Sequence, residues 1–93
     1  IEKYKASHDS LTGLYNKEYF YRHVHEIVNK NSGIQYCILC SNIKDFKFIN
    51  ELFGLKKGDE VLVKVGEFFN KYLEDDSICA RIENDRFAKR KIQ

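Results

Sequence analysis

The 93-residue sequence contains no proline, no tryptophan and no methionine, and it has no apolar run long enough to cross a bilayer. No membrane-spanning segment is therefore expected within it, and there are no internal repeats or low-complexity segments. The N-terminus, Ile1–Lys5, lacks the basic-then-apolar pattern of a signal peptide as well as an initiator Met, so we expect it to be a boundary inside a longer protein. The composition, 43% hydrophobic and 32% charged, is typical of one small globular domain with a modest core.

The sequence also lacks a strong charge of one sign. Its 16 Lys and Arg residues face 14 Asp and Glu residues, and the basic residues are spread along the chain, so nucleic acid is not expected as a partner. Only three cysteines are present. Cys37 and Cys40 are three residues apart in a predicted strand, which places their thiols on opposite faces and about 10 Å apart. With Cys79 in a second apolar run, three unpaired thiols favour a reducing cytoplasm over a disulfide or a zinc site.

Turn, helix and strand patterns alternate along the chain. Asp9–Asn16, hereafter the N-terminal loop, has turn chemistry: Gly13 is free to adopt positive φ, and Asn16 is placed to cap a helix that begins near Lys17. Asp9 is expected to fix this loop by pairing with a nearby base such as Lys17. The remaining pattern predicts a strand over 35–43, a short helix over 47–53, a longer helix from 58 to about 73, a strand over 77–82, a tight turn over 83–86 and a strand from 87. This order predicts an α/β domain with helices packed on a sheet.

Four short segments resemble, in order and in spacing, the GGDEF domain of diguanylate cyclases. They are Asp9–Asn16 (DSLTGLYN), Phe46–Asn50 (FKFIN), Phe53–Leu62 (FGLKKGDEVL) and Ala80–Ala88 (ARIENDRFA). The resemblance implies an α/β (α+β sandwich) fold with helices on a mainly antiparallel sheet, namely the N-terminal half of a ferredoxin-like nucleotidyl-cyclase fold. In that family each domain binds one GTP, and two domains that meet face to face make cyclic di-GMP with the help of two Mg²⁺ or Mn²⁺ ions.

The metal-binding positions of the family are largely altered in this sequence. By resemblance they fall on Asn42, Ile43 and Asp85, and a second acidic position of the family falls on Lys44. The amide of Asn42 is a neutral and weaker ligand than a carboxylate, and the ammonium of Lys44 repels a cation. Binding of Mg²⁺ or Mn²⁺ is therefore expected to be weakened.

The signature loop of the family is altered as well, and it corresponds to Glu83, Asn84, Asp85 and Arg86. Glu83 replaces a glycine and brings negative charge near the triphosphate, whereas Asn84, which replaces the second glycine, can still adopt a left-handed conformation. Asp85 stays acidic, but Arg86 replaces a glutamate that the family uses in catalysis. We therefore expect impaired catalysis and assign no catalytic residue, although Asp85 and Arg86 occupy signature-loop positions.

The substrate-binding positions of the family are better preserved, and they fall on Asp45, Phe46, Lys47, Asn50 and Asp59. Asn50 and Asp59 match the residues that read guanine, for which an amide and a carboxylate have suitable acceptors and donors. The backbone amides at the start of the short helix would face the phosphates, and Lys47 could add a cation. Folding alone offers a second explanation, with Asp59 as the N-cap of the long helix and with Phe46, Ile49 and Phe53 as core residues.

Residues 1–93 are thus expected to form a single partial GGDEF domain, with residues 1–8 as the end of an upstream linker. The basic tail Ala88–Gln93 is predicted to be a poor central strand, and the second half of the family's fold is not present, so an open sheet edge and uncovered apolar surface are expected. Three functions stay open. The first is a degenerate, regulatory GGDEF module that binds GTP beside a sensor or an EAL-type phosphodiesterase domain. The second is an active diguanylate cyclase, and the third is a purely structural module for interaction or homodimer formation that binds no nucleotide.

Overall fold

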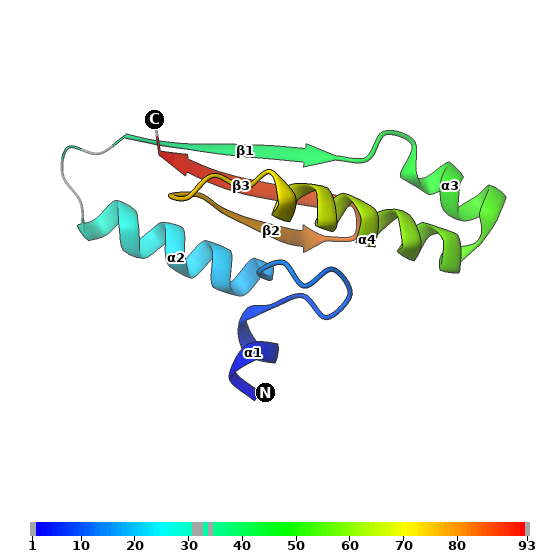
Figure 1. Cartoon of the computed structure of the whole chain (residues 1–93), viewed down its shortest axis with the longest axis horizontal. Coiled ribbons are helices and arrows are strands. Elements are labelled where there is room, and N and C mark those ends of the chain that lie inside the picture. Colours follow the sequence, from blue (N-terminus) through cyan, green and yellow to red (C-terminus); the bar gives the residue numbers. More distant parts are fainter. Residues whose placement is uncertain (1, 31–32, 34, 93) are drawn as a thin grey trace.

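The computed structural model describes residues 2–30, 33 and 35–92. Its elements follow in the order α1 (Glu2–Ser7), α2 (Lys17–Lys30), β1 (Tyr36–Asn42), α3 (Phe46–Phe53), α4 (Leu55–Lys71), β2 (Ile78–Glu83) and β3 (Arg86–Ile92). Among these residues the strands form one antiparallel sheet in the order β1-β3-β2, so that β3 is the central strand (Figure 1). The predicted fold class, helices packed on an antiparallel sheet, is confirmed.

Helices cover both faces of the sheet. Side chains alternate between these faces along each strand, so neighbouring residues of one strand belong to different cores. Ala80 of β2 and Ala88 of β3 lie in one core with Phe20 of α2, where their small side chains let the helix approach the sheet. Their neighbours Cys79 and Phe87 lie in the opposite core. That second core is completed by residues of the N-terminal loop, α3 and α4, namely Leu14, Phe46 and Leu62.

Most of the predicted elements are confirmed, and their local signals behave as expected. The Oδ1 atom of Asn16 accepts a hydrogen bond from the Tyr19 amide at 2.9 Å, as an N-cap side chain does. Gly13 has φ of 79°. The long helix differs from the prediction, because α4 begins at Leu55 and only Gly54, with φ of 89°, separates it from α3.

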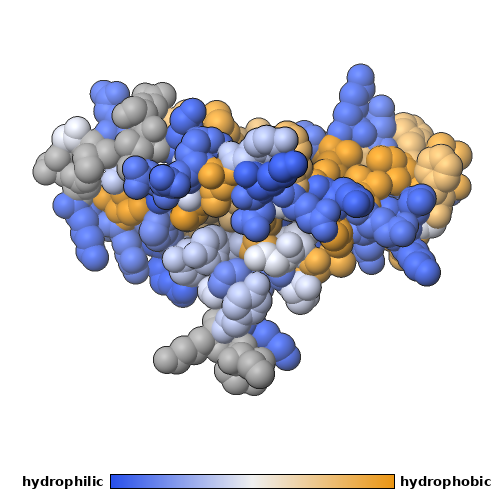
Figure 2. Space-filling model, in the orientation of Figure 1, coloured by the Kyte–Doolittle hydropathy of each residue, from blue (hydrophilic) through white to orange (hydrophobic). Residues whose placement is uncertain are grey.

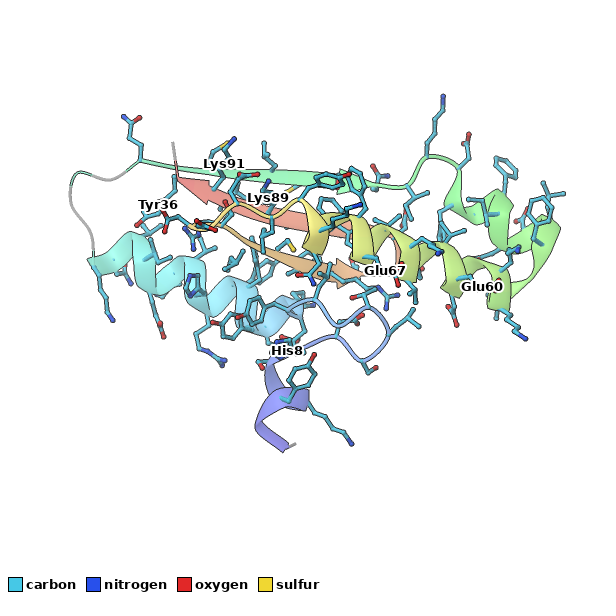
Figure 3. All side chains as sticks on the ribbon, in the orientation of Figure 1. His8, Tyr36, Glu60, Glu67, Lys89 and Lys91 are labelled. Atoms are coloured by element: carbon cyan, nitrogen blue, oxygen red, sulfur yellow. The ribbon has the colours of Figure 1, made fainter. Side chains whose placement is uncertain are left out.

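Helix α1 was not predicted, since residues 1–8 were expected to be the end of a linker. It contacts the domain through hydrogen bonds from Asn16 to the Ala6 and Ser7 carbonyls, at 3.1 and 2.9 Å, and through aromatic rings. The ring of His8, which Figure 3 labels at the junction of α1 and the N-terminal loop, stacks on Tyr4 with centroids 3.8 Å apart and lies 4.7 Å from the ring of Tyr15. No helix within the described part of the chain combines the length and the apolar character that crossing a membrane requires.

The prediction that the basic tail makes a poor central strand is wrong, because its charges have partners. Lys89 Nζ lies 2.6 Å from a carboxylate oxygen of Glu74, in the turn after α4. Arg90 is only 7% exposed and donates to the carbonyl oxygen of Asp76 at 2.7 Å. Figure 3 shows Lys89 and Lys91 at the same end of β3, close to Tyr36 of β1. A strand with three consecutive basic residues can therefore be central when an acidic turn lies across its end.

The expected open edge and uncovered apolar surface are confirmed. β1 lies at the edge of the sheet, and Ile38 and Leu39 in it are 47% and 51% exposed. A second apolar surface lies at the end of the molecule formed by α3 and the start of α4, where Figure 2 shows hydrophobic residues at the right-hand end. Phe53 belongs to that surface and is 65% exposed, so its prediction as a core residue is wrong.

Candidate functional site

The candidate site lies where β1 ends, α3 begins and the turn between β2 and β3 passes alongside. The register of the sheet pairs Asn42 of β1 with Arg86 of β3, which places the Glu83–Arg86 turn beside the end of β1. Phe46, 4% exposed, holds the first turn of α3 to the core. These elements enclose a hollow of about 430 Å³, lined by Asn42, Ile43, Asp45, Phe46, Lys47, Phe48, Asn50, Asn84 and Asp85.

Seven of the nine predicted site residues therefore line one hollow. They come from two segments more than thirty positions apart in the sequence, Asn42–Asn50 and Asn84–Asp85. Asp59 and Arg86 are not among the lining residues. Phe48 and Asn84 line the hollow without having been predicted as site residues. The local signal for Asn84 is its place in a tight turn, where Asn tolerates positive φ, whereas Phe48 carries no such signal.

The first turn of α3 begins with an unusual backbone conformation. Asp45 has φ of 58°, which turns the chain sharply from β1 into the helix, and its side chain makes no capping hydrogen bond. Its carbonyl oxygen accepts from the Phe48 and Ile49 amides at 2.9 and 3.3 Å, while the Phe46 amide donates to Ile43 at 3.3 Å. The Asp45 carboxylate is thus exposed at the rim of the hollow rather than engaged in the helix.

The Glu83–Arg86 turn, which corresponds to the predicted signature loop and is called the signature turn below, is held in place by its own side chains. Asn84 adopts the left-handed conformation with φ of 46°, as its type allows. The Asp85 carboxylate accepts a hydrogen bond from the Ile43 amide at 3.2 Å, which ties the turn to the end of β1. Arg86 donates to the Glu83 carboxylate at 2.5 Å, so these two opposite charges largely neutralise each other.

Arg81 of β2 links this turn to the N-terminal loop. Its Nε donates to the carbonyl oxygen of Asn84 at 2.8 Å, and its Nη1 lies 3.3 Å from both carboxylate oxygens of Asp9. One of these oxygens also accepts from the amide and the hydroxyl of Thr12, each at 2.8 Å. Burial raises the pKa of Asp9, but the Thr12 hydrogen bonds and the Arg81 charge outweigh it, so the pKa lies below its ordinary value. Asp9 does fix the loop, but its partner is Arg81 and not Lys17 as predicted.

The two residues matched to guanine reading lie on adjacent helices. Asn50 of α3 lines the hollow and packs against Gly58 of α4. Asp59 is the next residue along α4 and is exposed. Because α4 begins four residues earlier, at Leu55, Asp59 is not its N-cap, and that explanation for the residue is wrong. Asp59 is therefore not accounted for by capping.

The side chains in the hollow do not fit a pair of divalent cations. Within the described residues no group of three or more His, Cys, Asp or Glu side chains is placed to hold a metal ion. The oxygen donors near the end of β1 are the carboxylates of Asp45 and Asp85 and the amide of Asn42. Paired Mg²⁺ or Mn²⁺ ions require more carboxylate charge than this, and exposed Lys44, two residues from Asn42, opposes a cation.

Comparisons with known proteins bear on the fold and the family of this chain. The chain is 29% identical over 91 residues to the probable diguanylate cyclase DgcT of Escherichia coli, covering 95% of this chain and 20% of that protein. It is 34% identical over 87 residues to the cyclic di-GMP phosphodiesterase NbdA of Pseudomonas aeruginosa, covering 89% of this chain and 11% of that protein. The coiled coil and GGDEF domain of DgcB from Caulobacter crescentus, solved with c-di-GMP, has the same fold, with a TM-score of 0.93 at 24% identity.

The chain covers only part of each protein that it resembles. The match to DgcB extends over 98% of this chain and 49% of that structure, so the chain spans about half the length of this structural neighbour and a quarter or less of the two relatives above. A sequence model of the family described as "Diguanylate cyclase, GGDEF domain" matches residues 6–89, which is nearly the whole chain. The chain therefore belongs to the GGDEF domain family.

Proposed function

We propose that this chain is a degenerate GGDEF domain of a cyclic di-GMP signalling protein, which binds a guanine nucleotide and regulates its host protein without efficient synthesis of cyclic di-GMP. The observation that carries the proposal is the hollow at the end of β1. It brings together residues at the family's substrate positions, including Asn50 and Lys47, in a setting poor in metal-binding carboxylates.

The proposed loss of catalysis rests on charge. Phosphoryl transfer to a second nucleotide requires divalent cations that neutralise the phosphate oxygens. Asn42 places a neutral amide at the end of β1, and Arg86 pairs with the Glu83 carboxylate, so that neither residue adds net negative charge to the turn. Asp85, the remaining acidic residue of the turn, is already bonded to the Ile43 amide. The potential in the hollow is thus less negative than two cations require.

The proposed nucleotide binding rests on a cation and a helix N-terminus that would face the phosphates and on a carboxamide that would face the base. Lys47 is an exposed cation at the first turn of α3, and its Nζ is 4.0 Å from Glu51, a distance typical of a weak surface pair. It is therefore free to swing toward a phosphate. A helix N-terminus favours anions through the helix dipole, and Lys47 lies in the first turn of α3, a helix of eight residues. Asn50 supplies an amide donor and acceptor from the same helix for the edge of a base.

The proposed regulatory role rests on the relatives. Among the proteins that this chain resembles, NbdA and PdeB of Shewanella oneidensis are both named cyclic di-GMP phosphodiesterases, and the matching region is 11% and 10% of their lengths. A GGDEF domain therefore occurs in proteins whose named activity is phosphodiesterase. We propose that this chain acts in the same way, beside an EAL-type phosphodiesterase or a sensor domain, in the cytoplasm.

Titration calorimetry with GTP, with and without Mg²⁺, tests the proposed binding. We expect GTP to bind in both conditions with little enhancement by Mg²⁺, and ATP to bind more weakly. In parallel, mass spectrometry of the protein incubated with GTP and Mg²⁺ should detect no cyclic di-GMP. Binding with efficient synthesis would make the chain an active cyclase, and absence of any binding would leave only the structural module.

A gain-of-function variant tests the electrostatic explanation directly. Asn42→Asp combined with Lys44→Asp restores negative charge at the end of β1, and we expect Mg²⁺ to enhance GTP binding about tenfold in this variant. The control is Lys57→Asp, which reverses a charge on α4, where Lys57 pairs with Glu60 at 3.6 Å. An equal Mg²⁺ effect in both variants would contradict the explanation.

A further inference from the structure

Side chains of α3 pack against α4 at one glycine, Gly58. A Cβ atom placed on Gly58 would lie 1.9 Å from the Asn50 Oδ1 atom, 3.1 Å from its Cγ and 3.4 Å from Cζ of Phe46. Gly58 is buried at the end of the first turn of α4, and its amide donates to the carbonyl oxygen of the N-cap residue Gly54 at 3.1 Å. The Asn50 carboxamide therefore occupies the space that any other residue at position 58 would fill with its side chain.

A glycine here is not required by the backbone of α4. The structure gives no positive φ at Gly58, and glycine in a helix interior costs about 1 kcal/mol relative to alanine. Packing of the two helices alone does not require glycine either, because the atom nearest to the added Cβ is the end of the Asn50 side chain, which can rotate away. What the glycine preserves is the position of the Asn50 carboxamide.

We propose that Gly58 is a positioning residue for Asn50, and that it sets the selectivity of the hollow for guanine over adenine. The inference rests on the proposed nucleotide binding. Asn50 lines the hollow, so its amide lies between the surface of α4 and a bound base. A carboxamide held against a helix keeps one orientation of donor and acceptor, and discrimination between bases depends on that orientation.

The variant Gly58→Ala tests the proposal. We expect it to fold, because alanine favours the helix, and to displace the Asn50 side chain. The affinity for GTP should fall about tenfold while the affinity for ATP stays unchanged, which is the effect of losing one hydrogen bond to the base. A purely structural role of Gly58 would lower both affinities together or neither.

Gly66→Ala is the matched control. Gly66 is also buried in α4, two turns further along, and an added Cβ would lie 2.9 Å from Cβ of Thr12 in the N-terminal loop. This variant makes the same change in helix propensity and in burial, but it crowds a residue outside the hollow. We expect the ratio of GTP to ATP affinity to stay at the wild-type value in Gly66→Ala.

A double-mutant cycle with Asn50→Ala identifies the route of the effect. If Gly58 acts through Asn50, then Gly58→Ala causes no further loss of GTP affinity in the Asn50→Ala background. Additive losses, or an unchanged ratio of GTP to ATP affinity in Gly58→Ala, would overturn the proposal.

The side-chain amide resonances of Asn50 give a readout without nucleotide. They should shift in Gly58→Ala and stay in place in Gly66→Ala, and the absence of a shift would also overturn the positioning role. If the wild-type protein binds neither nucleotide while these resonances do shift, then the proposed function fails, the claim on base selectivity fails with it, and the packing role of Gly58 stands.

Discussion

Arg81→Met should destabilise the domain by removing the link between the N-terminal loop and the signature turn. Methionine keeps much of the aliphatic stem but loses the guanidinium, and with it the bond to the Asn84 carbonyl at 2.8 Å and the contacts with Asp9 at 3.3 Å. The Asp9 carboxylate keeps its bonds to Thr12, so it is left partly satisfied and not stranded.

The expected magnitude follows from this partial burial. The side chains of Arg81 and Asp9 are 17% and 19% exposed, so the pair is neither a surface ion pair, worth up to about 1 kcal/mol, nor a fully buried one, whose disruption costs about 3–5 kcal/mol. We therefore expect a loss of about 2–3 kcal/mol in the free energy of unfolding. The matched control is Arg22→Met on the exposed side of α2, which should change stability by less than about 0.5 kcal/mol.

Urea denaturation between pH 7 and pH 3 measures both the loss and its pH dependence. The pKa of Asp9 is lowered in the folded state, so its contribution is complete above the unfolded pKa of about 3.9 and disappears as pH falls through the lower, folded value. The difference in stability between wild type and Arg81→Met should therefore shrink in that acidic window. When Arg81→Met is made in the Asp9→Asn background, the loss of stability that it causes should already be smaller at pH 7.

Two results would refute this reasoning. One is an Arg81→Met variant as stable as Arg22→Met, which would mean that the contacts contribute nothing measurable. The other is strict additivity of Asp9→Asn and Arg81→Met, because groups in direct contact are expected to be coupled by more than about 0.5 kcal/mol.

Three other side chains, two of them buried and one partly buried, give measurable expectations. Burial and the charge of Arg90 lower the pKa of His23 and outweigh the opposing effect of Glu26 on α2. The free energy of unfolding should therefore decrease as the pH is lowered below about 6.5 in wild type, and it should decrease less in His23→Gln. Equal slopes in the two proteins would contradict this. Phe87→Ala should lower the free energy of unfolding by about 3–5 kcal/mol in urea denaturation, because Phe87 is among the largest fully buried side chains; a loss below about 1 kcal/mol would show that its core is loosely packed. Burial raises the pKa of the Cys79 thiol, so maleimide should label exposed Cys40 well before Cys79, and equal rates would show that the core opens freely.

The order of the elements could be predicted from sequence because their signals are local. The apolar spacing of α2, the capping side chain of Asn16 and the positive φ of Gly13 each act within a few residues. The central place of β3 could not be predicted in this way. Lys89 and Arg90 are poor strand-core residues on a propensity scale, and only the folded chain brings Glu74 and Asp76 across their path.

In the candidate site, too, the features with local sequence signals could be predicted and the long-range contacts could not. Its lining residues were largely predictable because two short motifs supply them, and the antiparallel register then places the motifs together. The contact between Arg81 and Asp9 was not, since the two residues are 72 positions apart and no local pattern pairs them. The start of α4 at Leu55 was missed because Gly54 and Gly58 suggested one longer break, whereas only Gly54 is a hinge and Gly58 is a packing site.

The signature turn shows how a site can keep its shape while its chemistry changes. Its geometry depends on the left-handed Asn84, on the bond from Asp85 to the Ile43 amide and on Arg81, none of which requires a cation or a nucleotide. Its electrostatics depend on Asp85 and on other groups, of which Glu83 and Arg86 neutralise each other. Because Asp85 is the only residue that belongs to both sets, the loss of catalytic charge that we propose does not entail collapse of the hollow. Under the proposed function, such a domain keeps the hollow that binds a nucleotide but does not transfer a phosphoryl group efficiently.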